Sequence, residues 1–210
     1  MKMRMRRRTA EIMSFYSLNS IHYRKSLRFV FTRLMEKWES FLLKRRLREP
    51  PHKAKVLDLG CGNLRYAELL CYRSNIVVGV DISIYMLKVA KMLWRNVHLV
   101  QADAHYLPFR NKAFQFILCT LAFNHFEHPL HVCREVSRVC CGRFIVSLIG
   151  SLFKLFERGG FIPFIGKNGV VWLFEKYYSI KDTIKIFSTC FRNIRILHVS
   201  PLLYLVEAFR

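Results

Sequence analysis

Apolar residues between positions 54 and 148 form short, nearly continuous runs, and amphipathic segments with helical spacing separate these runs. Continuous aliphatic runs are typical of strands in a parallel sheet that helices cover on both faces. The regular alternation of the two patterns predicts an α/β fold built on an open, doubly wound sheet. The expected strands are residues 55–60, 75–83, 97–104, 113–123 and 143–149, and the expected helices are residues 65–73, 85–94 and 128–140.

A second group of elements follows near the end of the chain. Ser179 and Asp182 have the spacing of a capping box, which predicts a helix over residues 178–191. Residues 192–199 and 203–210 then have the pattern of two closing strands. We expect these strands to extend the sheet beyond its parallel part.

The first part of the chain has a different pattern. Residues 26–47 place apolar side chains at helical spacing among many basic residues, which predicts an amphipathic helix. We expect its apolar face to pack against the domain that follows, with docking on a membrane surface as the alternative. The side chains of this face are Leu27, Phe31, Leu34, Trp38, Phe41 and Leu42. Two prolines within residues 49–53 end the helix and divide the chain into residues 1–53 and 54–210.

The charge of the chain is strongly unbalanced. It has 35 Lys and Arg against 14 Asp and Glu, and this net charge of +21 favours a polyanionic partner. RNA is the first expectation and an anionic membrane surface the second, while a merely basic surface is the alternative without a partner. No apolar run reaches the ~18 residues of a transmembrane helix and no signal-peptide pattern opens the chain, so we predict a cytoplasmic location. The seven cysteines form no CxxC pair, so we expect no metal site.

The segment VLDLGCGN, residues 56–63, joins the first expected strand to a glycine turn. In doubly wound sheets ligands bind beyond the carboxyl ends of the strands, so Gly60 and Gly62 are expected at a binding site. A dinucleotide fingerprint would have its third glycine where this chain has Arg65. Because Asp58 would repel a phosphate, the turn favours a ligand that carries an amino group or another cation.

Further aspartates end the next expected strands. Asp81 follows Gly60 by 21 positions, where a carboxylate can accept hydrogen bonds from both hydroxyls of a ribose. Asp103 closes the third expected strand, where it can accept a hydrogen bond from an exocyclic amine. Capping of the following helices is the structural alternative for these aspartates.

The segments VLDLGCGN, VGVDIS, VQADAHYLPF and FQFILCTLAFNHF resemble, in this order, the motifs of class I S-adenosylmethionine-dependent methyltransferases. The type 11 branch is the most similar, and the resemblance covers residues 54–148. It implies S-adenosyl-L-methionine as cofactor and a mostly parallel, Rossmann-like sheet of seven strands, the last one antiparallel. By the same resemblance, residues 1–53 would be a basic helical lid segment and residues 54–210 the methyltransferase domain.

The resemblance also implies which residues hold the methionine portion of the cofactor. The backbone of Gly60 and Gly62 would approach this portion closely, and Asp58 would face its amino group through water. Cys119 and Thr120, at the end of the fourth strand, would border the same amine. The sulfonium charge agrees with an acidic turn that has no lysine.

The adenosine portion would lie along the next two strand ends. Asp81 would hold the ribose hydroxyls, and Ile82 would lie against the adenine. Asp103 would accept a hydrogen bond from the adenine amine, and the N–H group of Ala104 would meet a ring nitrogen.

Tyr16 and Tyr23 have the spacing of the paired tyrosines in the family's N-terminal lid, so the resemblance adds them to the cofactor site. Simple helix packing is the alternative for both side chains. The chain has Ser17 and Arg24 where relatives often carry acids, which makes the entrance more positive.

Methyl transfer from a sulfonium is an in-line displacement, so holding the acceptor atom in line does most of the work. A general base is needed where the acceptor is protonated, and the candidates are His125, Glu127 and His128. His125 is the best placed by analogy, and a wall of the substrate site is its alternative role. The sequence therefore predicts a methyltransferase whose acceptor is RNA or, second, a small apolar molecule. The alternative is a non-catalytic module that keeps the fold and binds nucleic acid or a membrane surface.

Overall fold

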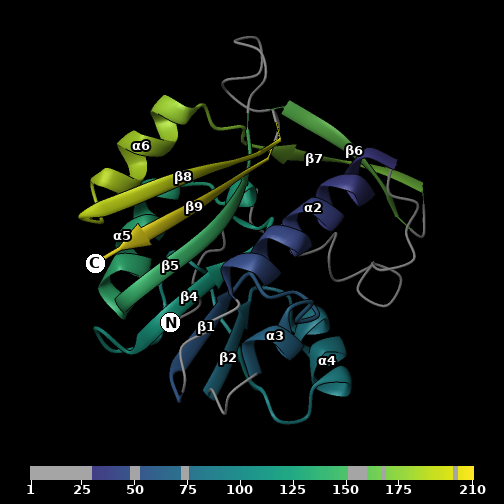
Figure 1. The fold of residues 1–210 in the computed structure, drawn as a ribbon. Helices are drawn as coiled ribbons and strands as arrows, with labels where there is room; N and C mark the ends of the chain where they lie inside the picture. The colour runs from purple at the N-terminus through teal and green to yellow at the C-terminus, as the bar shows by residue number, and fades with distance from the viewer. Residues whose placement is uncertain (1–29, 48–52, 72–75, 151–159, 167–168, 201–202) are drawn as a thin grey trace.

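The computed structural model describes residues 30–47, 53–71, 76–150, 160–166, 169–200 and 203–210. A seven-stranded sheet lies at the centre of this part of the chain (Figure 1). Its strands stand in the order β3-β2-β1-β4-β5-β9-β8. The bounds are β1 Lys55–Leu59, β2 Ile76–Asp81, β3 His98–Gln101, β4 Phe114–Cys119, β5 Cys140–Ile149, β8 Asn193–Ser200 and β9 Leu203–Phe209.

The strands β1 to β5 are parallel, and β9 runs antiparallel between β5 and β8. This arrangement confirms the predicted doubly wound sheet, with its last strand antiparallel. The register aligns Asp58 of β1 with Gly79 of β2 and with Leu118 of β4. The carboxyl ends of β1, β2 and β4 therefore meet at one edge of the sheet.

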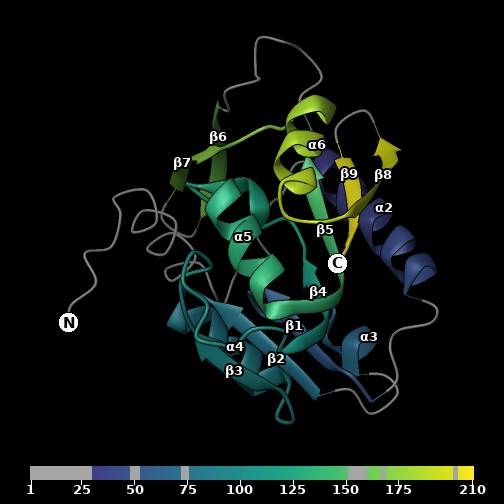
Figure 2. The same ribbon diagram turned by 90° about the vertical axis from the view of Figure 1, so that its left-hand side faces the viewer.

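Helices cover both faces of the sheet. Buried residues of α2, α3 and α4 form one hydrophobic core, and buried residues of α5 and α6 contribute to the other. Figure 2 shows α5 and α6 on the near side of the sheet and α2 on the far side. The bounds are α2 Val30–Arg46, α3 Ala67–Cys71, α4 Ile84–Leu93, α5 Pro129–Val139 and α6 Ile180–Ser188, and a short 3-10 helix, η1, covers Phe123–His125.

Helix α2 packs against the sheet, but with a different face from the expected one. Leu43 and Leu47 are buried in the core, whereas Trp38 is 48% and Phe41 54% exposed. The prediction of a buried stripe through Trp38 and Phe41 is therefore wrong. The buried row includes Glu39, four positions before Leu43, and an acid there hid this row from a search for apolar spacing. Leu27 lies outside the described residues, and the side chains of Phe31 and Leu34 are likewise not described.

A separate two-stranded antiparallel sheet follows β5 and was not predicted. It consists of β6, Gly160–Gly166, and β7, Gly169–Glu175. Pro163 interrupts the pattern of β6, and glycines stand at both its ends, so the sequence reads as a poor strand. The hairpin brings Glu175, its last residue, back toward η1.

The predicted capping box opens α6. The hydroxyl of Ser179 accepts a hydrogen bond from the N–H group of Asp182 at 3.1 Å and donates to its carboxylate at 2.7 Å. None of the helices in the described ranges combines the length and apolar character needed to cross a bilayer.

Candidate functional site

The turn after β1 depends on glycines in the left-handed region. Gly60 has φ +67° and Gly62 has φ +52°, a conformation that costs other residues roughly 1–2 kcal/mol. The N–H group of Cys61 donates to the carbonyl of Val80 at 2.9 Å, which ties the turn to β2. A Cβ atom at Gly60 would collide with the Cβ of Ala122, so the chain beyond β4 lies directly against the turn. The turn therefore presents bare backbone at the carboxyl edge of the sheet.

Asp81 ends β2 and binds the same turn. Its Oδ2 accepts from the N–H group of Gly62 at 2.9 Å, and its Oδ1 accepts from the N–H group of Ser83 at 2.8 Å. Burial raises the pKa of the Asp81 carboxyl, and these backbone donors lower it in part. Each carboxylate oxygen has a second lone pair, so both can also accept from the hydroxyls of a ligand.

Asp103 lies beyond the end of β3 and is fixed by a histidine. Its Oδ1 accepts from the backbone N–H group of His105 at 2.9 Å and lies 2.6 Å from the Nδ1 atom of that ring. The Nε2 atom of His105 accepts from the N–H group of His128 at 3.2 Å. These contacts assign the neutral tautomer with its proton on Nδ1. His105 therefore orients the Asp103 carboxylate.

The two neighbouring residues predicted at the adenosine end occupy the same edge. The carbonyl of Ile82 accepts from the side-chain amide of Gln101 at 3.0 Å, which links the residues that follow β2 and end β3. Ala104 is buried next to Asp103. Both residues thus lie close to the strand-end acids that the sequence grouped with them.

Asp58 is 2% exposed at the end of β1. Burial raises the pKa of Asp58 from an ordinary 3.8 to about 7; the charge of Arg65 opposes this shift, while those of Asp81 and Glu39 add to it. Its Oδ1 has no hydrogen-bond partner among the described residues. A buried carboxylate oxygen without a donor is costly, so the position is complementary to an ammonium group.

The end of β4 contributes backbone to the same carboxyl edge of the sheet. Cys119 is fully buried, and this burial raises the pKa of its thiol well above the usual range, so its side chain is unsuited to act as a nucleophile. Thr120 follows it, half-buried. The strand ends earlier than expected because Leu121 adopts φ +50° and turns the chain into η1. The N–H group of Leu121 donates to the hydroxyl of Ser147 at 2.8 Å, which holds this bend against β5.

The segment that contains the glycine turn and the strand-end acids also matches a known family. Residues 57–143 match the family model described as a methyltransferase domain. The chain contains a methyltransferase domain. The resemblance to class I S-adenosylmethionine-dependent methyltransferases is thereby confirmed.

Relatives of the methyltransferase domain include enzymes whose names state an acceptor. The chain is 28% identical over 143 residues to the demethylmenaquinone methyltransferase of Thermotoga maritima, covering 62% of this chain and 61% of that enzyme. It is 29% identical over 135 residues to the malonyl-[acyl-carrier protein] O-methyltransferase of a Marinomonas species, covering 58% and 50%. The chain spans between 32% and 61% of the length of the Thermotoga enzyme and two Methanocaldococcus jannaschii proteins that it also matches.

Solved structures share the fold of the methyltransferase domain. The magnesium protoporphyrin IX methyltransferase of Synechocystis, solved with bound S-adenosylmethionine, superimposes with a TM-score of 0.70 at 13% identity, and all of both chains is covered. A Pyrococcus horikoshii protein superimposes with a TM-score of 0.65 at 23% identity, covering 95% of this chain and 98% of that one. At these identities the likeness shows the fold.

The predicted base candidate of the methyltransferase has an acidic partner that the sequence did not reveal. The Nε2 atom of His125 lies 3.4 Å from Oε1 of Glu175, and both side chains are nearly buried. Asn124 holds this corner together, since its side chain binds the backbone of Ile149 in both directions at 3.0 Å and donates to the carbonyl of Lys176. The charge of His125 also lowers the pKa of the Asp81 carboxyl slightly.

Two other site residues were not predicted from the sequence, and two predicted ones lie outside the described residues. Glu39 and His105 gave no motif, because a buried acid in a helix and a histidine beside an aspartate are recognised only through their partners. A signal for Glu39 was available in its spacing of four and eight positions from Leu43 and Leu47. Tyr16 and Tyr23 lie outside the described residues, so their role remains a prediction.

Proposed function

We propose that the protein is an S-adenosylmethionine-dependent methyltransferase that transfers a methyl group by in-line displacement. The observation that carries this proposal is the row of carboxylates Asp58, Asp81 and Asp103 at the ends of the adjacent strands β1, β2 and β3. The glycine turn, with its bare backbone, lies in the same row. Along this row, a methionine-bearing adenosine needs an ammonium acceptor, then acceptors for two hydroxyls, then an acceptor for the adenine amine.

The residues present fit this cofactor. Asp81 retains acceptor capacity on both oxygens for the ribose hydroxyls. His105 fixes the orientation of the Asp103 carboxylate, which is proposed to accept from the adenine amine. Asp58 has a buried oxygen that lacks a donor, which suits the ammonium group. When bound, the cofactor supplies a methyl group on a sulfonium. The protein then has to hold the acceptor atom in line and exclude water.

We propose His125 as the general base for acceptors that carry a proton. Glu175 lies 3.4 Å from its Nε2 atom, where a carboxylate stabilises the imidazolium that forms when the ring takes up a proton. Asn124 and its backbone partners fix the position of the ring relative to β5 and β7. His125 thus has the two features of a base, an imidazole ring and a partner that orients it.

For the acceptor we propose a small molecule with an apolar body. The relatives with named acceptors act on demethylmenaquinone or on a malonyl group carried by a protein. The expectation of RNA, drawn from the net charge of +21, has no support in these names. RNA, an anionic membrane surface and a cytoplasmic location remain predictions from composition.

The test is a transfer assay with S-adenosylmethionine labelled on its methyl group. Purified protein is offered a demethylated quinone, a malonyl thioester and a structured RNA at equal ionic strength, and the labelled product is isolated. We expect label on the quinone or the thioester. Label on RNA alone would overturn the acceptor class, and cofactor binding without transfer to any acceptor would favour the non-catalytic module.

A further inference from the structure

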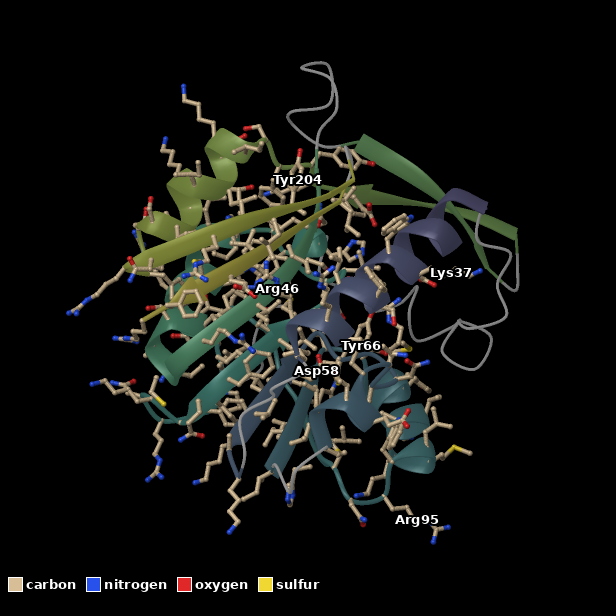
Figure 3. All side chains as sticks on the ribbon, viewed as in Figure 1. Lys37, Arg46, Asp58, Tyr66, Arg95 and Tyr204 are labelled. Atoms are coloured by element: carbon tan, nitrogen blue, oxygen red, sulfur yellow. The ribbon has the colours of Figure 1, made fainter. Side chains whose placement is uncertain are left out.

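Helix α2 carries a buried acid to the methionine end of the proposed cofactor site. Glu39 is fully buried, and its Oε2 accepts from the guanidinium of Arg65 and from the hydroxyl of Tyr66, both at 2.8 Å. Its other oxygen, Oε1, has no hydrogen-bond partner among the described residues. Tyr66, whose hydroxyl binds Glu39 of α2, and Asp58 are labelled in Figure 3.

The carboxylates of Glu39 and Asp58 influence each other and a common third group electrostatically. The charge of Glu39 contributes to the raised pKa of Asp58, and both charges act on the thiol of Cys119 at the end of β4. Like charges on two buried carboxylates repel each other, and each of these carboxylates leaves one oxygen without a donor among the described residues. A cation that donates to both oxygens would relieve the repulsion and satisfy the hydrogen bonds together.

Glu39 forms an ion pair with Arg65 through Oε2, and this ion pair leaves Oε1 unused. Its contacts with Arg65 and Tyr66 use one oxygen, and a glutamine carbonyl could accept both of these hydrogen bonds. A glutamine would also avoid burying a second negative charge beside Asp58. The feature that needs an explanation is therefore the buried Oε1 oxygen of Glu39, which has no hydrogen-bond partner among the described residues.

We propose that Glu39 and Asp58 together bind the α-ammonium group of the cofactor's methionine portion, so that α2 forms part of the cofactor site. This inference rests on the proposed function and extends it to a residue far from the glycine turn in sequence. The ligand chemistry is a primary ammonium with donors for two carboxylates at once.

The decisive experiment compares two ligands that differ in this ammonium group. S-adenosylhomocysteine carries it, whereas 5′-methylthioadenosine has the same adenosine and no amino acid. Calorimetry on Glu39→Gln should give S-adenosylhomocysteine binding weakened roughly ten- to hundredfold, with 5′-methylthioadenosine binding unchanged. Glu36→Gln is the matched control, because Glu36 also pairs with Arg65, at 3.3 Å, but is partly exposed.

The pH dependence gives a second readout. Since Asp58 has a pKa of about 7, wild-type affinity for S-adenosylhomocysteine should rise as the pH increases through that value. Removing the neighbouring charge in Glu39→Gln should move this midpoint to lower pH, and Glu36→Gln should leave it in place. The titratable groups that act on Asp58, or on which it acts, are Glu39 of α2, Cys61 of the turn, Arg65 and Tyr66 before α3, Asp81 of β2 and Cys119 of β4.

The outcomes distinguish a failure of the inference about Glu39 from a failure of the proposed function. If Glu39→Gln binds S-adenosylhomocysteine as tightly as wild type, or loses both ligands equally, Glu39 does not bind the ammonium and the inference is wrong. If wild-type protein binds neither ligand, the proposed function itself fails. Tyr66→Phe removes one contact of Glu39 but leaves its carboxylate in place. This variant should therefore still bind S-adenosylhomocysteine in preference to 5′-methylthioadenosine.

Discussion

At the residue scale, the acids of the site differ in how the protein holds them. Asp81 accepts backbone hydrogen bonds from Gly62 of the glycine turn and from Ser83, whereas Asp103 depends on His105. A ring that donates from Nδ1 and accepts at Nε2 is locked at both ends. His105 is therefore a positioning residue, which acts on an adenine ligand through the carboxylate that it orients.

Replacing His105 by Ala should release the Asp103 carboxylate and weaken binding of S-adenosylhomocysteine roughly tenfold. His105→Asn keeps a side-chain donor near Asp103 and should recover part of the loss. The readout is calorimetry with adenosine and with inosine, because a role at the adenine amine predicts a loss of preference between these two nucleosides. His131→Ala is the control, since its ring lies 5.8 Å from His105 by centroids and a loss of similar size there would contradict the assignment.

At the element scale, the β6–β7 hairpin has a chemical consequence. Its last residue, Glu175, meets His125 of η1, so an element outside the main sheet supplies the partner of the proposed base. The backbone of Lys176 donates to the carbonyl of Asn124 at 2.9 Å, which fastens the end of the hairpin to η1. The base and its partner are thus held by contacts between two elements far apart in the sequence.

Glu175→Gln should lower kcat by about a hundredfold on a protonated acceptor, because the imidazolium loses its carboxylate. Affinity for S-adenosylhomocysteine should stay within a factor of about two, since Glu175 is proposed to act on the acceptor side. Steady-state kinetics over a range of pH, together with calorimetry, measure both quantities. Glu127→Gln serves for comparison, and a greater loss of kcat in that variant than in Glu175→Gln would identify Glu127 as the base instead.

The sheet could be predicted from the sequence because its signals are local. Each of β1 to β5 contains a short run of apolar residues, and Asp58 and Asp81 stand at or next to the strand ends that the turn chemistry marks. The hairpin, by contrast, has Pro163 in its first strand, and its pairing depends on contacts that a single run of residues does not encode. Glu39 and Glu175 were missed for a related reason, since each is defined by a partner more than twenty positions away.

At the scale of the whole molecule, the buried carboxyl of Asp58 lowers the free energy of unfolding once it ionises. The pKa of Asp58 is about 7 in the folded protein, against an ordinary 3.8, so the folded state disfavours the charged form. Stability is therefore highest where this carboxyl is protonated in the fold, and it falls as the pH rises from about 4 through 7. A chain with a net charge of +21 nevertheless buries this acid beside another, which suits a site that binds a cation.

Asp58→Asn should therefore stabilise the ligand-free protein by about 2–4 kcal/mol at pH 8 and much less at pH 5. Chemical denaturation at the two pH values measures the difference. Glu68→Gln, which neutralises an exposed acid on α3, should change little at either pH. An Asp58→Asn protein that gains equally at both values, or loses stability at pH 8, would show that the buried charge is not the cause.

The central claim, that the strand-end acids form a cofactor site, is tested most directly by calorimetric titration of S-adenosylhomocysteine into wild-type protein and Asp81→Ala. The variant removes the carboxylate proposed for both ribose hydroxyls, and we predict a loss of about 2–4 kcal/mol in binding free energy. Glu68→Gln, which removes an exposed acid on α3, should bind nearly as wild type does. Unchanged affinity in Asp81→Ala, or no binding to the wild-type protein, would contradict the account.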